Sequence, residues 1–189
     1  MAVTFSTSTG AAGGVQSAYA NELTAALEGQ FADIADNNVS TFVNETSAVL
    51  AYGGLGVVNG SGSVGNSVKT IAAATDTVVG VVALTYVDES ASDSNSRPGV
   101  KDDQAVNVLS KGVVAVFCVE AVDLTSEVRV YHDADTGTTS GSFAGRFAAT
   151  AAANKTAVLS GARWVSKTSA AGIALLELNG PDFSLTADT

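Results

Sequence analysis

The sequence has few charged residues, few aromatic residues and almost none of the residues that bind metals or form disulfides. Charged side chains make up 15% of the 189 residues and aromatic side chains 6%, while 46% of the chain is hydrophobic. Cys118 is the single cysteine and His132 the single histidine. A disulfide-stabilised fold is therefore excluded, and so is a zinc site built on cysteine and histidine. The apolar content is too high for an intrinsically disordered chain.

Basic residues are also scarce. Nine Lys and Arg stand against 19 Asp and Glu, so the net charge is −10, and residues 1–68 contain no Lys or Arg. Binding to nucleic acid or to an anionic membrane requires a basic surface, so we expect neither as a partner. Met1–Asn21 carries no charge. It nevertheless lacks both the long apolar run of a membrane span and the basic start of a signal peptide.

Valine is abundant, with 26 residues against 12 leucines. This ratio favours strands, because β-branched side chains suit a pleated surface and lose rotamers in a helix. After Ala48 the chain is a series of short apolar runs separated by turn residues, with no helical pattern between them. The pattern predicts a mainly β fold, a single β-barrel or sandwich of short strands. The predicted strands are Ala48–Val58, Val68–Ala74, Val78–Val87, Ala105–Leu109, Val113–Val122, Glu127–His132, Ser142–Ala149, Ala157–Val165 and Gly172–Leu178.

The first quarter of the chain has a different composition. Residues 1–15 are mostly Gly, Ser, Thr and Ala without a period, which indicates an extended segment. A short helix is predicted at about residues 17–28, begun by Ser17 and ended by Gly29. We therefore divide the chain into an N-terminal arm, residues 1–47, and a β-barrel domain, residues 48–189.

Three further features of the barrel domain lead to expectations. Asp88–Asp103 is polar and acidic, and it is predicted to be a solvent-facing loop. Val113–Val119 is apolar on both faces, so both faces need cover, from the arm or from a neighbouring subunit. Trp164, the only tryptophan, is expected to be buried.

No motif indicates catalysis. In the segment His132–Gly137, Asp133 and Asp135 fit the start of a calcium loop, but the glycine comes one position early and the final glutamate is missing. The D-T-G letters of an aspartic protease occur there once, although that chemistry needs two aspartates. A nucleophilic triad would need a serine across the fold. A polar turn explains the segment best. We expect no enzyme, no cofactor and no metal, and the sequence leaves open whether Asp88–Asp103 binds a cation.

Several short motifs resemble a known family. The chain is similar to the start of the tailed-phage structural cement proteins, also called capsid decoration or head-stabilising proteins. The similar segments are Gly29–Asp33, Val43–Glu45 and Val49–Gly53. In that family a G-Q-x-A-D stretch precedes a V-N-E stretch and the first strand. Gly112–Val116 and the segments after Gly141 and Gly161 look like its barrel strands, so the resemblance covers roughly residues 19–179.

The resemblance implies a non-enzymatic virion structural protein, made in the cytoplasm of the bacterial host. It implies binding to the outer capsid surface, where the protein bridges major capsid proteins and stabilises the head. Sister copies are further expected partners, as a homotrimer or alternatively a dimer. Two other functions remain open: a β-module of a phage tail or baseplate, and a secreted β-rich binding or hydrolytic domain.

The family match and the change of composition together assign a set of arm residues to capsid or subunit contact. The apolar anchors are Tyr19, Leu23, Leu27, Phe31, Ile34 and Phe42, and the polar contacts are Gln30, Asp33, Asn44 and Glu45. In the alternative interpretation, Leu23, Leu27 and Phe31 cover the chain's own barrel.

Overall fold

The structure is a computed structural model, which describes residues 26–33, 36–51, 53–62, 65–84, 88–92, 98–133, 143–181 and 183–188. Its regular elements are all strands, so the prediction of a mainly β fold is confirmed. Most of the predicted helix at about residues 17–28 lies outside the described residues. Its last three positions, 26–28, contain no helix and lead into a turn at Glu28 and Gly29.

Five strands close into a barrel. These are β1 (Asn38–Asn44), β4 (Ser67–Thr70), β3 (Gly56–Asn59), β5 (Val78–Val82) and the first half of β8 (Ala105–Cys118). Each pairs with the next in that order, and β8 pairs back with β1, so the ring has no free edge. β1 therefore belongs to the barrel, although it lies within the range 1–47 that the sequence assigned to the arm.

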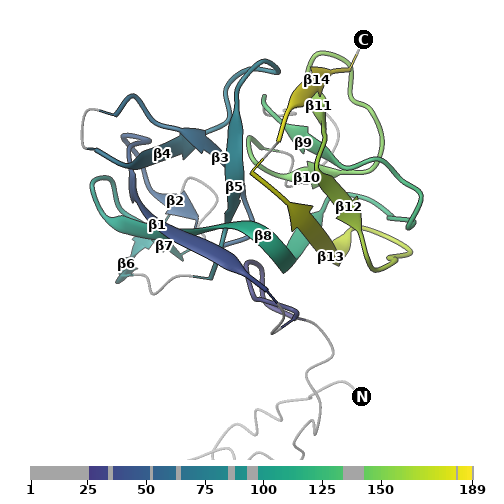
Figure 1. The fold of residues 1–189 in the computed structure, drawn as a ribbon, viewed down its shortest axis with the longest axis horizontal. Helices are drawn as coiled ribbons and strands as arrows, with labels where there is room; N and C mark the ends of the chain where they lie inside the picture. The colour runs from purple at the N-terminus through teal and green to yellow at the C-terminus, as the bar shows by residue number, and fades with distance from the viewer. Residues whose placement is uncertain are drawn as a thin grey trace, which may run out of the picture.

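The second half of β8 continues into another group of strands, here called the second lobe. One edge of β8 pairs with β13, which pairs with β12, and the other edge leads through β10, β9 and β11 to β14. The strands are β9 (Arg129–Tyr131), β10 (Phe147–Ala148), β11 (Thr156–Leu159), β12 (Ala162–Trp164), β13 (Gly172–Asn179) and β14 (Leu185–Ala187). β8 thus runs through both parts of the molecule and joins them (Figure 1).

Gly112 marks the point where β8 passes from the barrel to the second lobe. Its φ of 126° lies in the region that side chains disfavour. A Cβ atom at this position would lie 1.9 Å from Oδ1 of Asn37. Both constraints require glycine, so this single residue lets one strand serve two parts of the fold.

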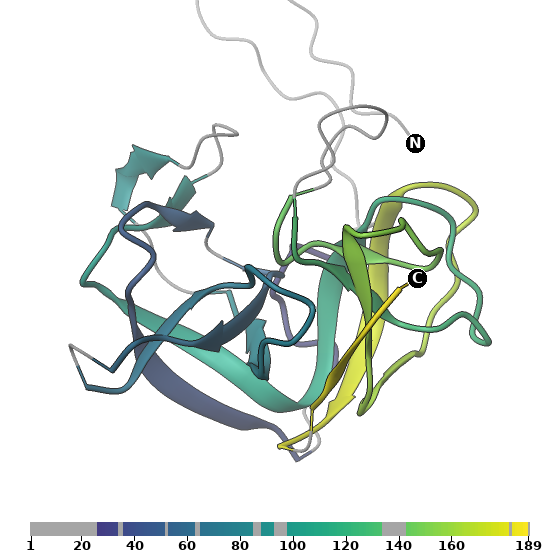
Figure 2. The same ribbon diagram turned by 90° about the horizontal axis from the view of Figure 1, so that it is seen from above.

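A separate small sheet corrects one prediction. β6 (Asp88–Ser92) and β7 (Pro98–Val100) pair with each other, and β7 pairs with β2 (Leu50–Ala51). The segment Asp88–Asp103 is therefore not simply a solvent-facing loop, because Val100 and Leu50 are each only 2% exposed and pack into the barrel. Figure 2 shows this sheet on the side of the barrel away from the second lobe.

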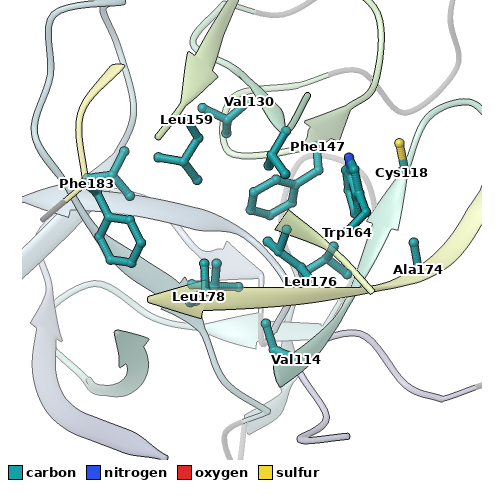
Figure 3. Packing of buried hydrophobic residues seen from close by; sticks show 14 of the residues in the cluster. Val114, Cys118, Val130, Phe147, Leu159, Trp164, Ala174, Leu176, Leu178 and Phe183 are labelled. Carbon is teal, nitrogen blue, oxygen red and sulfur yellow. The ribbon is translucent and has the colours of Figure 1, made fainter. Parts of the chain in front are cut away.

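The largest hydrophobic cluster crosses from the barrel to the second lobe. Val81 and Leu109, from the barrel strands, share this cluster with Phe147, Trp164 and Leu176 of the second lobe (Figure 3). Trp164 is 2% exposed, so its predicted burial is confirmed. The barrel interior has its own cluster, which includes Phe42, Val57, Val68, Val106 and Val108.

The chain itself covers both faces of the apolar run Val113–Val119. Val114, Val116 and Cys118 pack into the large cluster, while Phe117 and Val119 pack with Tyr131 and Ala148 in a smaller one. The arm contributes to this cover, as expected, because Gly29 and Ala32 hydrogen-bond to Ala115 and Val113, and no neighbouring subunit is needed for the packing of the residues named above. The run had supported a trimer, so it no longer argues for one.

Candidate contact surface at the seam between barrel and second lobe

Residues 27–32 form a strap along the edge of β8, immediately beyond the stretch that pairs with β1. Gly29 donates its backbone N–H to the carbonyl of Ala115 at 2.7 Å, and Ala115 donates back to Gln30 at 2.9 Å. Ala32 donates to the carbonyl of Val113 at 3.0 Å. The strap and β1 therefore lie along one edge of β8, and the strap occupies the seam where the barrel meets the second lobe.

The glycines of the family motifs allow backbones to approach closely here. A Cβ atom on Gly29, whose φ is 80°, would lie 2.7 Å from Cα of Gly53 and from the backbone nitrogen of Leu84. A Cβ atom on Gly53 would lie 2.5 Å from the carbonyl oxygen of Glu28. Leu84 also donates its N–H to the carbonyl of Gly29 at 2.8 Å. The strap is thus fastened to the barrel through contacts that only glycine permits.

An ion pair fastens the same strap to the second lobe. Glu28 lies 2.8 Å from Nη1 of Arg146, and their side chains are 22% and 6% exposed. The guanidinium carbon of Arg146 lies 4.6 Å from the ring centroid of Phe117 and 4.7 Å from that of Phe143. Stacking on aromatic rings suits the flat guanidinium group and shields the pair from water. The sequence does not reveal this contact, because 118 residues separate the two charges.

Two of the predicted contact residues serve inside the fold. The side chain of Asn44 is fully buried, and its amide nitrogen donates to the carbonyls of Ala48 and Val100 at 3.0 Å each. Its Oδ1 accepts hydrogen bonds from the backbone and the hydroxyl of Thr46. The carboxylate of Glu45 accepts hydrogen bonds from Ser61 and Ser67. The V-N-E motif therefore ties the end of β1 to neighbouring segments.

The remaining predicted residues fall into three groups. Phe42 is 8% exposed and points into the barrel cluster. Gln30 and Asp33 are exposed, and Oε1 of Gln30 accepts a hydrogen bond from the backbone of Leu27 at 3.0 Å. Leu27 and Phe31 are the exposed apolar residues of the set, at 57% and 41%. Tyr19, Leu23 and Ile34 lie outside the described residues.

Leu84 completes an exposed apolar group that we call the seam surface: Leu27, Phe31 and Leu84. Leu84 is 41% exposed, and its backbone hydrogen bond to Gly29, which lies between Leu27 and Phe31 in the sequence, places it beside the strap. The sequence analysis missed Leu84, because it counted the residue as part of the strand Val78–Val87. Exposed large apolar side chains on neighbouring backbone segments are typical of an interaction site.

The described residues offer little for catalysis or metal binding. Among them, no group of three or more His, Cys, Asp and Glu could hold a metal ion. Burial raises the pKa of the Cys118 thiol to about 11, so its reactive thiolate form is rare at neutral pH. The backbone N–H of His132 donates a hydrogen bond to the carbonyl of Lys155, and residues 134–137 of the segment His132–Gly137 lie outside the described part. No helix in the described ranges is long and apolar enough to cross a membrane.

A barrel joined to a second β lobe, with an exposed apolar surface at the seam, has the features of a binding or structural protein. The sequence model of the family described as "Structural cement protein (E217 gp24/Pam3 gp6)" matches residues 15–179. The chain belongs to this structural cement protein family, which confirms the resemblance found in its sequence. It is accordingly a structural protein of the phage head, of a family whose role is not enzymatic.

A solved structure shows the same fold. A chain from "The capsid of Myoviridae Phage XM1" superposes with a TM-score of 0.60 and 20% sequence identity. The match covers 86% of this chain and 95% of that chain. A search of curated proteins found no match.

Proposed function

We propose that the protein binds the outer surface of a tailed-phage capsid, where it bridges major capsid proteins and stabilises the head. The observation that carries the proposal is the seam surface on a member of the cement family. Leu27, Phe31 and Leu84 are large and apolar, and the strap that presents two of them is held by backbone hydrogen bonds. A rigid apolar group needs little ordering when it meets a partner, so more of its burial contributes to affinity.

The charge of the protein supports an outer position. With a net charge of −10, the chain is repelled by the packaged DNA inside a head. The cement family, together with this charge, favours attachment from outside in many copies. A homotrimer on the capsid remains our prediction for the arrangement of these copies, with a dimer as the alternative.

The seam surface can be tested with a double variant, Leu27→Ser with Phe31→Ser. Both side chains are exposed, so we expect the variant to fold as the wild type does. We also expect it to lose co-sedimentation with purified heads that lack the protein, and these heads should rupture at a lower temperature than heads carrying the wild type. Leu124→Ser is the matched control, because Leu124 is 50% exposed but lies far along the chain, before β9.

Two results would contradict the proposal at different levels. Equal binding of the double variant and the wild type would show that the capsid contact lies away from the seam surface. Wild-type protein that sediments with tails and not with heads would favour the tail or baseplate function instead.

A further inference from the structure

The barrel has a hollow at one end. It measures about 290 Å³ and lies where β3 ends and β1 and β5 begin. Its apolar part is formed by Phe42, Val78, Val79 and Val108. The remaining lining residues are Ser40, Asn59, Thr77, Ser110 and Pro181. None of the described residues that line the hollow is charged, although the chain as a whole is strongly acidic.

The hollow lies where two positions near the end of the barrel carry small side chains, the exposed Ser40 and the half-buried Ser110. Ser40 and Phe42 alternate on β1, and Val108 and Ser110 alternate on β8, so the four residues share the inner face of the paired strands. Phe42 and Val108 fill the barrel interior and are 8% and 1% exposed. In the register of the two strands Ser40 lies opposite Val108 and Phe42 opposite Val106, and Ser110 lies at the register shift that follows the pair of Val39 and Leu109. The two serines therefore occupy successive positions towards the end of the barrel, where their small side chains leave space beside Phe42 and Val108.

The start of the chain has matching chemistry. The first 21 residues carry no charged side chain, and Phe5 is the only aromatic residue before Tyr19. Val3 and Phe5 are separated by one residue, so in an extended chain their side chains lie on the same side. A neutral segment with one aromatic side chain suits a neutral hollow with an apolar floor, because an aromatic ring gains most from leaving water.

Residues 1–25 lie outside the described part. This segment is long enough to reach a neighbouring molecule. Fully extended, 25 residues span roughly 80 Å, while a 189-residue domain has a radius of gyration of about 16 Å. We propose that residues 2–9 of a sister copy bind in this hollow, with Phe5 against Phe42 and Val108. This inference rests on the proposed function in one respect, which is that sister copies lie next to one another on the head.

The binding step can be measured without heads. The receptor is the full-length variant Phe5→Ser, which has no competing phenylalanine, and the probe is a synthetic peptide of residues 2–12. We expect saturable binding by isothermal titration calorimetry, and at least about tenfold weaker binding by the same peptide with Phe5→Ser. Absence of binding, or equal affinity of the two peptides, would overturn the proposal. Neither result depends on whether the protein binds capsids.

Matched variants of β1 locate the peptide. In the same receptor, Ser40→Trp places a large side chain in the hollow. The control Val39→Trp adds the same side chain at the neighbouring residue, which points to the outer face of β1 and is 40% exposed. We expect the first to abolish peptide binding and the second to leave it unchanged. If Ser40→Trp fails to fold, Thr77→Trp obstructs the hollow from the loop before β5. A peptide that still binds to a folded variant with a blocked hollow would refute the site.

Disulfide trapping identifies the donor molecule. Cys118 is buried, so the cysteines introduced by Ser6→Cys and Thr77→Cys can be oxidised without it. A full-length chain with both substitutions should form cross-linked dimers and larger species on a non-reducing gel. A cross-link found only within single chains would show that the segment binds its own barrel, and would contradict donation by a sister copy.

Discussion

Trp164 lies edge-on to Phe147, with ring centroids 6.4 Å apart and an angle of 84° between the ring planes. This pair occupies the cluster that joins the barrel to the second lobe. We expect Trp164→Ala to lower the free energy of unfolding by about 3–5 kcal/mol, because it leaves a large cavity. Chemical denaturation followed by circular dichroism measures the loss. The neighbouring Arg163→Ala is the control, since that side chain is 72% exposed, and a comparable loss there would argue against the cavity explanation.

Cys118 makes the free energy of unfolding depend on pH in the alkaline range. Burial raises the pKa of the thiol from 9.0 to about 11, so the folded state keeps its proton where the unfolded chain loses it. The protonated Cys118 thiol therefore makes its full contribution to the free energy of unfolding below pH 9, and this contribution is lost as the pH rises through 11. We expect the wild type to lose about 2–3 kcal/mol more than Cys118→Ala over that interval in denaturation experiments. Parallel pH profiles of the two proteins would exclude this explanation.

At the scale of elements, the strap depends on the ion pair between Glu28 and Arg146. Glu28→Gln removes the charge but keeps the shape, and it removes the ion pair of 2.8 Å that joins the strap to Arg146. We expect a loss of about 2–3 kcal/mol in the free energy of unfolding, because this largely buried ion pair is broken on one side. The control is Lys167→Ala, whose pair with Asp123 at 3.0 Å is exposed on both sides and should contribute nothing measurable. Unchanged stability of Glu28→Gln would mean that Phe117 and Phe143 suffice to hold Arg146.

The strands that could be predicted are those with continuous apolar runs. Val78–Val87 and Gly172–Leu178 contain β5 and β13, and the runs Ala105–Leu109 and Val113–Val122 proved to be one strand that passes through Gly112. β1 was missed because its sequence, NVSTFVN, does not alternate cleanly and four of its seven residues are exposed. β6 and β7 were missed because their sequences are polar or contain proline. Their pairing depends on partners distant in sequence, which no local pattern records.

The contact site was predictable only in part, for a similar reason. The family motifs marked the region of the chain that contains the strap, but a motif does not say whether a residue faces a partner or its own fold. Asn44 is fully buried, while Leu27 is 57% exposed, although both were assigned to the same role. The difference comes from β8, whose pairing with β1 turns Asn44 inward and whose edge holds the strap beside Leu27.

At the scale of the whole molecule, barrel and second lobe share β8 and one hydrophobic cluster, so neither should remain folded alone. A chain that begins at Ala48 lacks the strap and β1, which opens the ring between β4 and β8 and removes Phe42 from the barrel interior. We expect it to lose the blue-shifted fluorescence of Trp164, although that residue lies in the second lobe. A chain that begins at Ala26 keeps both segments and should retain the native spectrum and a cooperative unfolding transition. If the chain from Ala48 instead kept its Trp164 buried, the second lobe would fold independently, and the boundary between arm and barrel would lie near residue 47 after all.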